Sequence, residues 1–427
     1  MSPRVLIAGG CVLTLGTRTP NHKQADVLIE DDVIAEVGTG LRAHHAEHVD
    51  ATDTIVMPGF VDTHRHAWTS LFRNLGQDDP SAAGDGPDAF GPDDVYASTL
   101  IGLLGAAEAG ITTVVDWSHA GDDDALAEAA LRAHRDAGLR TVFVHTGRGD
   151  ALSERVRRLK DAAGPSTTIA FGCVAPGATG LDAAAGDWAA ARELGLRIHA
   201  HAESNGIAPS ARCGLLGEDV TVVHGSKLEP SVADAIASSG AAISVAPVSE
   251  MAGGHGSPPI QDLIDRDVRP GLAVDDERLA PGDLFAQMRA AISMQHATVF
   301  DRKLAGKSGV PKLMTTRDVI RFATSDGAAA AGLRGVIGSL EVGMQADVIV
   351  LDADRPNIFP INDPIGAVVW GMDTSNVSWV FVGGRALMRE GVLDADVQRA
   401  RGLATEARRR VADGSGSIVG AASGGSG

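Results

Sequence analysis

The feature that most restricts the fold of this chain is a regular alternation of short β-branched runs with Ala-rich stretches between residues 59 and 334. Such runs are typical of buried strands, and the stretches between them have the composition and length of helices. Eight strands with helical crossovers predict an α/β fold, a (β/α)8 TIM-type barrel. An open, doubly wound sheet is the alternative, but no Gly-rich phosphate loop follows the first strand, so the barrel is favoured. The expected strands are 54–61, 111–116, 141–145, 167–173, 196–201, 220–224, 241–245 and 270–274, and the clearest helices are 94–109, 123–137, 183–194 and 231–238.

The two ends of the chain have a different residue pattern from the barrel region. Short strands separated by turns, without a helical period, precede the barrel region and return after residue 335. We expect these two ends to form one small discontinuous β-sandwich beside the barrel. The expected divisions are a β-sandwich from residues 1–58 and 335–396, a barrel from 59–334, a helix at 397–412 and a Gly/Ser-rich disordered tail at 413–427.

Composition and charge restrict the possible partners. The chain has 427 residues and a formal net charge of −18, which disfavours nucleic acid or an anionic membrane as the main partner. No apolar run reaches membrane-spanning length, and the beginning of the sequence lacks the pattern of a secretory signal. Three widely spaced cysteines do not suggest a disulfide framework. We therefore expect a cytoplasmic protein that acts on a small molecule.

Histidines gather at the predicted C-terminal ends of the barrel strands, where barrel enzymes carry their chemistry. His64 and His66 follow the first strand, and residues two apart on a strand share a face. Such a pair alone is a weak signal, because two neighbouring histidines are more often packed or solvated than bound to metal. Three imidazoles with one carboxylate, however, are a sound ligand set for Zn²⁺ or a similar ion. The other candidates at or just past strand ends are Asp116, His119, His145, His199, His201, His224, Asp275 and Asp276.

At these positions the sequence resembles the amidohydrolase superfamily, and the resemblance extends from Arg4 to about Ala412. It is most similar to the mononuclear branch that contains the cytosine, guanine and S-adenosylhomocysteine deaminases and the triazine hydrolases. No lysine ends the fourth strand, so a lysine-bridged binuclear centre is not expected. The stretches that carry the resemblance are PGFVDTHRH at 58–66, IHAH at 198–201, VVHG at 222–225, LAVD at 272–275 and GSLEVGMQAD at 338–347.

The resemblance implies a metal-dependent hydrolase. His64, His66, His201 and Asp275 would bind one divalent ion, with zinc as the first candidate and iron or manganese as alternatives. A metal-bound hydroxide would attack an sp² carbon of an aminated heterocycle or cyclic amidine, and ammonia, an amine or chloride would leave. Asp275 would move the water's proton, and His224 would stabilise the developing charge. The resemblance also implies a homodimer or higher homo-oligomer.

One departure from the resemblance concerns the proton shuttle. The deaminases carry a glutamate three residues after the fifth-strand histidine, whereas Glu203 follows His201 by two. The loop is therefore one residue shorter or the shuttle is missing. Taking His199 as the ligand fits no better, and we expect His199 to be a packed histidine deeper in the barrel.

Substrate contacts are expected from the loops, where the alternatives are about equal. A loop-stabilising role is the alternative for His119, and a solvated Gly-rich loop is the alternative for Glu250 and His255. The segment 77–92 is either a surface loop or a lid. Arg65 should point away from the metal into a salt bridge. The predicted substrate-binding residues are His119, His145, Glu203, Glu250 and His255.

Two rival functions remain open at this point. The displaced Glu203 motivates a non-hydrolytic lyase or dehydratase, which would turn over substrate without incorporating oxygen from water. A non-catalytic binding protein that kept the fold is the other, but such a protein would not need to retain four metal ligands.

Overall fold

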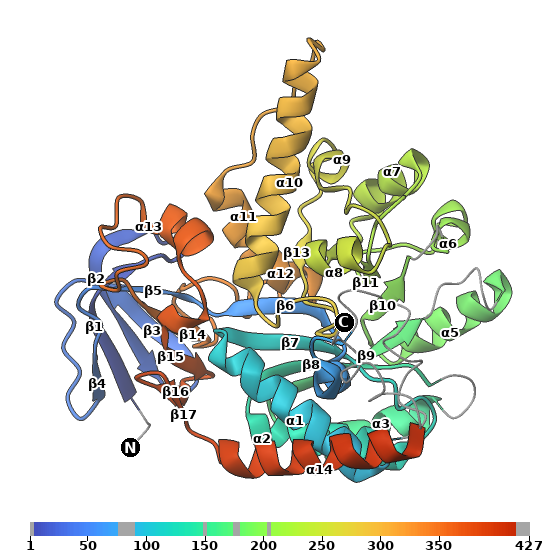
Figure 1. The fold of residues 1–427 in the computed structure, drawn as a ribbon, viewed down its shortest axis with the longest axis horizontal. Coiled ribbons are helices and arrows are strands. Elements are labelled where there is room, and N and C mark those ends of the chain that lie inside the picture. Colours follow the sequence, from blue (N-terminus) through green and yellow to red (C-terminus); the bar gives the residue numbers. More distant parts are fainter. Residues whose placement is uncertain (1–3, 76–89, 148–151, 174–179, 203–205, 416–427) are drawn as a thin grey trace, which may run out of the picture.

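The computed structural model describes residues 4–75, 90–147, 152–173, 180–202 and 206–415 (Figure 1). Eight parallel strands pair in chain order, as predicted. Backbone hydrogen bonds join the last strand to the first: the Asp275 amide donates to the His64 carbonyl, and the His66 amide donates to the Asp275 carbonyl, both at 2.9 Å. The barrel is thus nearly closed, and its seam lies at the predicted site residues. Its strands are β6 (Phe60–Arg65), β7 (Ile111–Trp117), β8 (Arg140–His145), β9 (Thr167–Cys173), β10 (Ile198–His201), β11 (Val220–Val223), β12 (Ala242–Val245) and β13 (Gly271–Leu272).

Helices cover the outside of the barrel, and their ends follow local signals. In α2 the Asp123 side chain accepts hydrogen bonds from two amides of the first turn, and Gly138 ends the helix in the left-handed conformation (φ 77°). The four helices expected most clearly are confirmed, with ends that differ by at most two residues. The helices around the barrel are α1 (Pro92–Glu108), α2 (Asp124–Ala137), α3 (Leu152–Ala162), α5 (Leu181–Glu193), α6 (Ala208–Arg212), α7 (Pro230–Ser239), α8 (Pro247–Ala252), α9 (Ile260–Ile264), α10 (Leu284–Leu304), α11 (Thr316–Phe322) and α12 (Ser325–Ala330), with a 3₁₀ turn at Ala67–Phe72.

The two ends of the chain form a separate mixed sheet. Its order is β17-β16-β15-β14-β5-β1-β2-β3, with β4 also on β1, so β14 from the C-terminal half pairs with β5 from the N-terminal half. Successive residues of these strands face two different cores. Val56 and Val350 pack inside the curved sheet, whereas Ile55 and Ile349 pack in the core that the sheet shares with the barrel. The strands are β1 (Arg4–Val12), β2 (His22–Glu30), β3 (Val33–Gly38), β4 (Glu47–Asp50), β5 (Thr54–Pro58), β14 (Val348–Asp352), β15 (Val377–Val382), β16 (Arg385–Arg389) and β17 (Val392–Leu393).

The apolar run 54–61, expected to be a single strand, is divided between the two sheets at Gly59. β5 pairs with β1 and β14 on one side of this residue, and β6 pairs with β7 on the other. A Cβ at position 59 would lie 2.1 Å from Cγ2 of Thr112, so only glycine fits here. The prediction of one strand was wrong because an unbroken apolar run does not show where its backbone changes partner.

The C-terminal helix is longer than expected. α14 (Val397–Ser415) contacts α1, where Arg410 pairs with Asp94 at 2.6 Å, and it ends three residues after the predicted Ala412. The predicted disordered tail therefore overlaps the helix at 413–415, and the rest of it lies outside the described residues. Most of the segment 77–92, expected to be either a surface loop or a lid, also lies outside them. The short elements before β15 are α13 (Pro364–Gly366), a π turn at Ala367–Gly371 and a 3₁₀ turn at Thr374–Asn376. In the part of the chain that the structure describes, no helix combines the length and apolarity needed to span a bilayer.

Candidate metal centre

Three predicted ligands meet at the seam of the barrel. Nε2 of His64 lies 3.2 Å from Nε2 of His66, and the two nitrogens lie 3.4 and 3.3 Å from Oδ1 of Asp275. Ligand atoms bound tetrahedrally to zinc at about 2.0–2.1 Å are roughly 3.3 Å apart. The donor chemistry and the spacing therefore both fit a divalent cation.

Two further histidines complete the cluster. His64, His201 and His224 each offer a nitrogen within 4.8 Å of the others, as do the donor atoms of His64, His66 and Asp275. The His201 ring lies 4.9 Å from the His64 ring and 5.1 Å from the His224 ring, measured between centroids. The structure thus brings together all four residues predicted as ligands, together with His224.

A β-bulge aims His64 into the barrel. Asp62 pairs with Val114 and Arg65 pairs with Asp116, so β6 has one residue more than β7 over this interval. Val61 packs in the barrel interior, and strict alternation would have turned His64 outward. The extra residue reverses the alternation of inward and outward side chains along β6, so His64 and His66 point inward and Arg65 points outward.

The outward Arg65 side chain lies in a buried ion cluster, as predicted. Its Nε donates to Oδ2 of Asp62 at 2.7 Å, its Nη2 donates to the Gly282 carbonyl at 2.9 Å, and its Nη1 lies 3.4 Å from Glu277. Arg73 also pairs with Glu277, at 2.9 Å. This cluster fixes the chain between the two histidines from the side opposite the metal donors.

The carboxylate of Asp275 is held by both its backbone and its side chain. Asp275 has a left-handed φ of 66°, and His224 a φ of 64°, a conformation that costs free energy for any residue other than glycine. The Ser249 hydroxyl donates to Oδ2 of Asp275 at 2.7 Å, which leaves Oδ1 toward the histidines. Neighbouring Asp276 instead binds Arg278, at 2.6 Å, as expected of a loop residue.

The electrostatic state of the cluster suits metal binding. Burial alone would raise the pKa of Asp275, but the charge of His224 and hydrogen bonds from His64 and His66 outweigh it and hold that pKa well below its ordinary value. Burial lowers the pKa of His64 far below its ordinary value. The neutral imidazole and the ionised carboxylate are the forms that coordinate a cation.

Glu250 makes a different contact from the one expected. It is fully buried in α8, where Oε1 lies 3.3 Å from Nδ1 of His224 and accepts from the Ala246 amide at 2.9 Å, and Oε2 accepts from Ser226 at 2.6 Å. Both carboxylate oxygens are thus engaged inside the protein. Glu250, on the helix that follows the seventh strand, therefore contacts and orients His224 at the end of the sixth strand.

Of the other predicted substrate contacts, His119 and His255 lie beside the cluster and His145 does not. Nε2 of His119 lies 2.9 Å from Nδ1 of His66, and the exposed His255 ring is stacked parallel to the His224 ring, with centroids 6.1 Å apart. His145 lies two residues after the outward-facing Phe143 on the same strand, so its side chain also points outward, away from the cluster. It is 1% exposed, and burial together with the Arg155 charge lowers its pKa to about 4. Glu203 lies outside the described residues.

Two side chains at the site were not predicted from the sequence. Trp117 ends β7 and packs against His201, with ring centroids 4.2 Å apart, and Ser249 binds Asp275. Trp117 follows the already suspected Asp116, so strand parity could have assigned it to the interior. His199, predicted to be packed, is buried in β10, and burial together with the Arg197 charge lowers its pKa to about 3.

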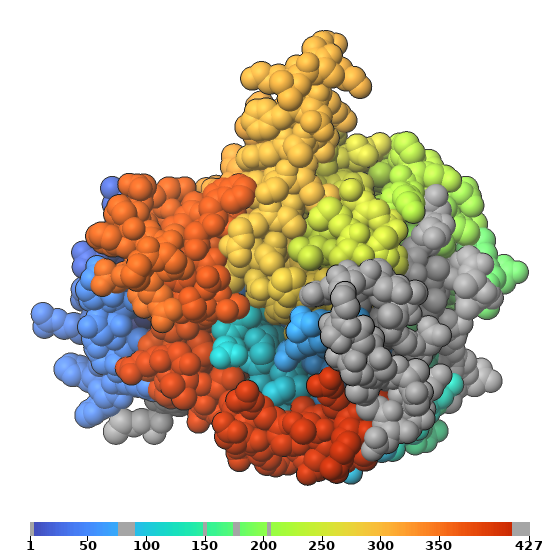
Figure 2. Space-filling model, viewed as in Figure 1, coloured from blue at the N-terminus to red at the C-terminus, as the bar shows by residue number. Residues whose placement is uncertain are grey.

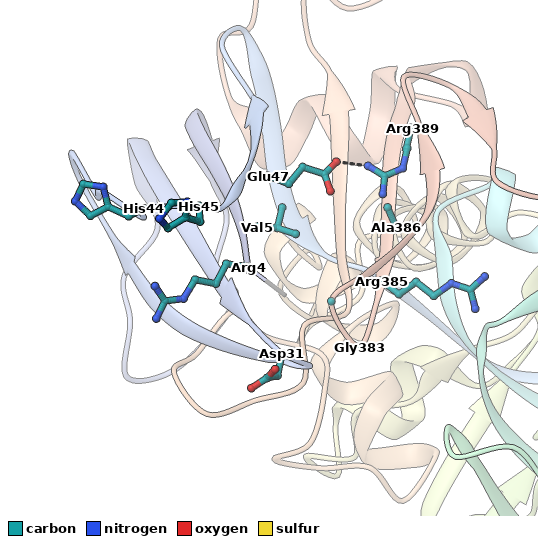
Figure 3. Close-up of a pocket in the computed structure, with 11 residues that line it drawn as sticks. Arg4, Val5, Asp31, His44, His45, Glu47, Gly383, Arg385, Ala386 and Arg389 are labelled. Carbon is teal, nitrogen blue, oxygen red and sulfur yellow. Dashed lines mark hydrogen bonds and ion pairs between the residues drawn. The ribbon is translucent and has the colours of Figure 1, made fainter. Parts of the chain in front are cut away.

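A separate hollow of about 790 Å³ on the mixed sheet contains none of the predicted site residues (Figure 3). Two of its three arginines already have acidic partners: Arg389 contacts Glu47, and Arg4 pairs with Glu30 at 2.9 Å. The metal donors, at the C-terminal ends of the barrel strands, are therefore the stronger candidate for chemistry.

Comparison with known proteins gives one family and a consistent set of relatives. The model of the amidohydrolase family matches residues 55–387. A 5'-deoxyadenosine deaminase of Methanosarcina mazei is 28% identical over 415 residues, which cover 90% of this chain and 93% of that protein. A 5-methylthioadenosine/S-adenosylhomocysteine deaminase of Halobacterium salinarum is 28% identical over an alignment of 445 residues, covering 95% of this chain and 100% of that protein.

Solved structures share the whole fold. An adenosine deaminase of Xanthomonas campestris with bound zinc superimposes with a TM-score of 0.79 at 20% identity, covering 96% of this chain and 98% of the other. An atrazine chlorohydrolase of Arthrobacter aurescens in complex with zinc gives a TM-score of 0.80 at 21% identity, covering 95% and 100%.

Proposed function

The chain belongs to the amidohydrolase family, and we propose that it is a metal-dependent hydrolase that removes ammonia from an aminated heterocycle. Its relatives are deaminases of adenosine-type compounds, so such compounds are the first candidate substrates, and release of an amine or chloride is the alternative. The observation that carries the proposal is the convergence of four donor residues and His224 at the barrel seam.

We propose one divalent ion per chain, zinc in the first place, held by His64, His66, His201 and Asp275. Zinc-bound relatives and the donor spacing support this assignment. Such a cation would supply a Lewis acid and lower the pKa of water toward neutrality.

The protein's own residues would then move the proton and stabilise charge. Oδ1 of Asp275 faces the histidines and lies 4.0 Å from Nε2 of His224, so it can accept a proton there, while Ser249 fixes Oδ2. Glu250 contacts Nδ1 of His224 and so fixes the ring with Nε2 toward the cluster, where it can stabilise developing negative charge. His119 and His255, beside the cluster, are the proposed substrate contacts, and Glu203 remains a prediction.

The two rival functions are not favoured. Neither a lyase nor a binding protein is suggested by the family or by the deaminase and chlorohydrolase relatives. We also propose a homo-oligomer in the cytoplasm. Cys11, Cys173 and Cys213 are all described and all outside disulfides, which supports that location.

Elemental analysis of the purified chain tests the proposal, with His64→Ala and Asp275→Ala in parallel. We expect about one transition-metal ion per chain in the wild type and loss of metal in both variants. The loaded protein is then screened for ammonia, amine and chloride release from a panel of adenosine derivatives, pyrimidines and triazines. A chain that stays metal-free after reconstitution, or a loaded one that releases nothing from the panel, would contradict the proposal.

A further inference from the structure

The second half of α10 forms an arm that projects from the molecule (Figures 1 and 2). We define the arm as residues 297–317, which comprise the end of α10 and the segment that returns along it. The return is fixed at its root: Gln295 donates to the Lys312 carbonyl and accepts from the Met314 amide, both at 2.9 Å, and His296 lies 2.8 Å from the Met314 carbonyl. The arm is therefore a braced element of the fold.

The arm exposes apolar side chains to an unusual degree. Leu304 is 86% exposed, Phe300 44%, Leu313 42% and Val310 37%. A gathering of large apolar side chains on a projection is typical of an interaction surface.

The arm is also basic on a chain that is otherwise acidic. It contains one acidic residue, Asp301, against five basic ones, whereas the whole chain has a net charge of −18. Its partner should therefore be acidic and should offer apolar side chains of its own. The basic residues are Arg302, Lys303, Lys307, Lys312 and Arg317.

This chain has such a surface at the base of the same helix. We define the acidic patch as residues 352–373, which carry four aspartates and one arginine and expose Phe359 (65%) and Trp370 (48%). Arg289, near the start of α10, donates to the Met372 carbonyl at 2.9 Å and ties the patch to the helix. The aspartates are Asp352, Asp354, Asp363 and Asp373.

We propose that the arm of one chain docks on the acidic patch of a second copy, and that the second arm docks reciprocally. Arg289 and Leu304 are separated by about 22 Å along the helix at 1.5 Å per residue. A two-fold axis across α10 would place the two helices antiparallel, with each basic tip beside the partner's acidic base. The interface is self-complementary, as a closed two-fold dimer requires.

The test of the apolar contact is the oligomeric state in solution. We expect a wild-type dimer by sedimentation velocity and light scattering. Leu304→Glu should raise the dimer dissociation constant by at least about tenfold. Val392→Glu, at another strongly exposed apolar position (69%) on β17, should leave it unchanged.

Charge reversal tests the pairing of arm with patch. Lys303→Glu/Lys307→Glu and Asp354→Lys/Asp363→Lys should each be largely monomeric, with the wild-type melting transition as the check on folding. A mixture of the two should form a heterodimer, and one chain carrying all four changes should dimerise again.

Several outcomes would overturn the proposal. A wild-type chain that stays monomeric up to about 100 μM would do so, because a dimer with a dissociation constant well below that value would be populated there. So would a dimer whose dissociation constant is unchanged by Leu304→Glu or by charge reversal. Binding of the arm to phosphatidylserine vesicles by a chain that stays monomeric would also overturn it.

Discussion

Replacing Arg65 by methionine should destabilise the protein by an amount that the buried ion cluster determines. Arg65 and Asp62 are fully buried and Glu277 is 3% exposed, so the substitution leaves the Asp62 carboxylate without its cation, whereas Glu277 keeps its pair with Arg73. Breaking a buried ion pair typically costs about 3–5 kcal/mol. With an unfolding entropy of about 2.1 cal/mol/K per residue, 427 residues give about 0.9 kcal/mol/K, so the melting temperature should fall by roughly 3–6 °C.

Differential scanning calorimetry at one fixed scan rate measures this shift. The matched control is Arg158→Met, which removes an exposed pair with Asp124 at 2.9 Å and should change the melting temperature by less than about 1 °C. Adding Asp62→Asn to Arg65→Met should recover part of the loss, because the orphaned Asp62 charge is then removed. An Arg65→Met protein that melts within 1 °C of the wild type would refute the reasoning.

Four further predictions follow from the contacts of the site. Ser249→Ala should weaken metal binding about 10–100-fold in a chelator competition, because Asp275 loses the hydrogen bond that orients it; equal affinity would contradict this. Glu250→Gln should lower kcat for the best substrate by roughly 10–100-fold with metal content unchanged, because His224 loses a charged partner; an altered KM alone would point to substrate contact instead. Arg65 and Arg73 outweigh burial and lower the pKa of Glu277, so its contribution to stability should be complete above about pH 5 and lost as the pH falls through its lowered pKa. Melting temperatures of the wild type and Glu277→Gln should therefore converge on acidification, and a constant difference would count against the assignment. Dialysis against a chelator should abolish turnover and zinc should restore it, whereas full activity of a metal-free sample would exclude the proposed role.

The main outline of the fold could be predicted from the sequence because its signals are local. Each barrel strand is a short apolar run, and the histidines lie where those runs end. The strand order and the meeting of His64, His66 and Asp275 at one end of the barrel could therefore be predicted together. The mixed sheet was recognisable at both termini, and its pairing of β5 with β14 gives one curved sheet around its own core.

The remaining features depend on contacts between distant residues. The bulge in β6 exists only relative to β7, so the sequence predicted that His64 and His66 share a face without determining which face. The turn of Glu250 toward His224 and the outward direction of His145 likewise depend on how a loop folds and on strand phase.

The joint at Gly59 has a consequence for how this protein can be divided or recombined. Thr54–Pro58 is paired on both edges within the mixed sheet, and His64 follows only five residues after the joint. A shift of the mixed sheet would therefore be transmitted along β6 to the metal donors. A chimera that exchanges the barrel between relatives should retain its function only when both terminal segments are transferred with it, since they set the position of the strand that carries His64.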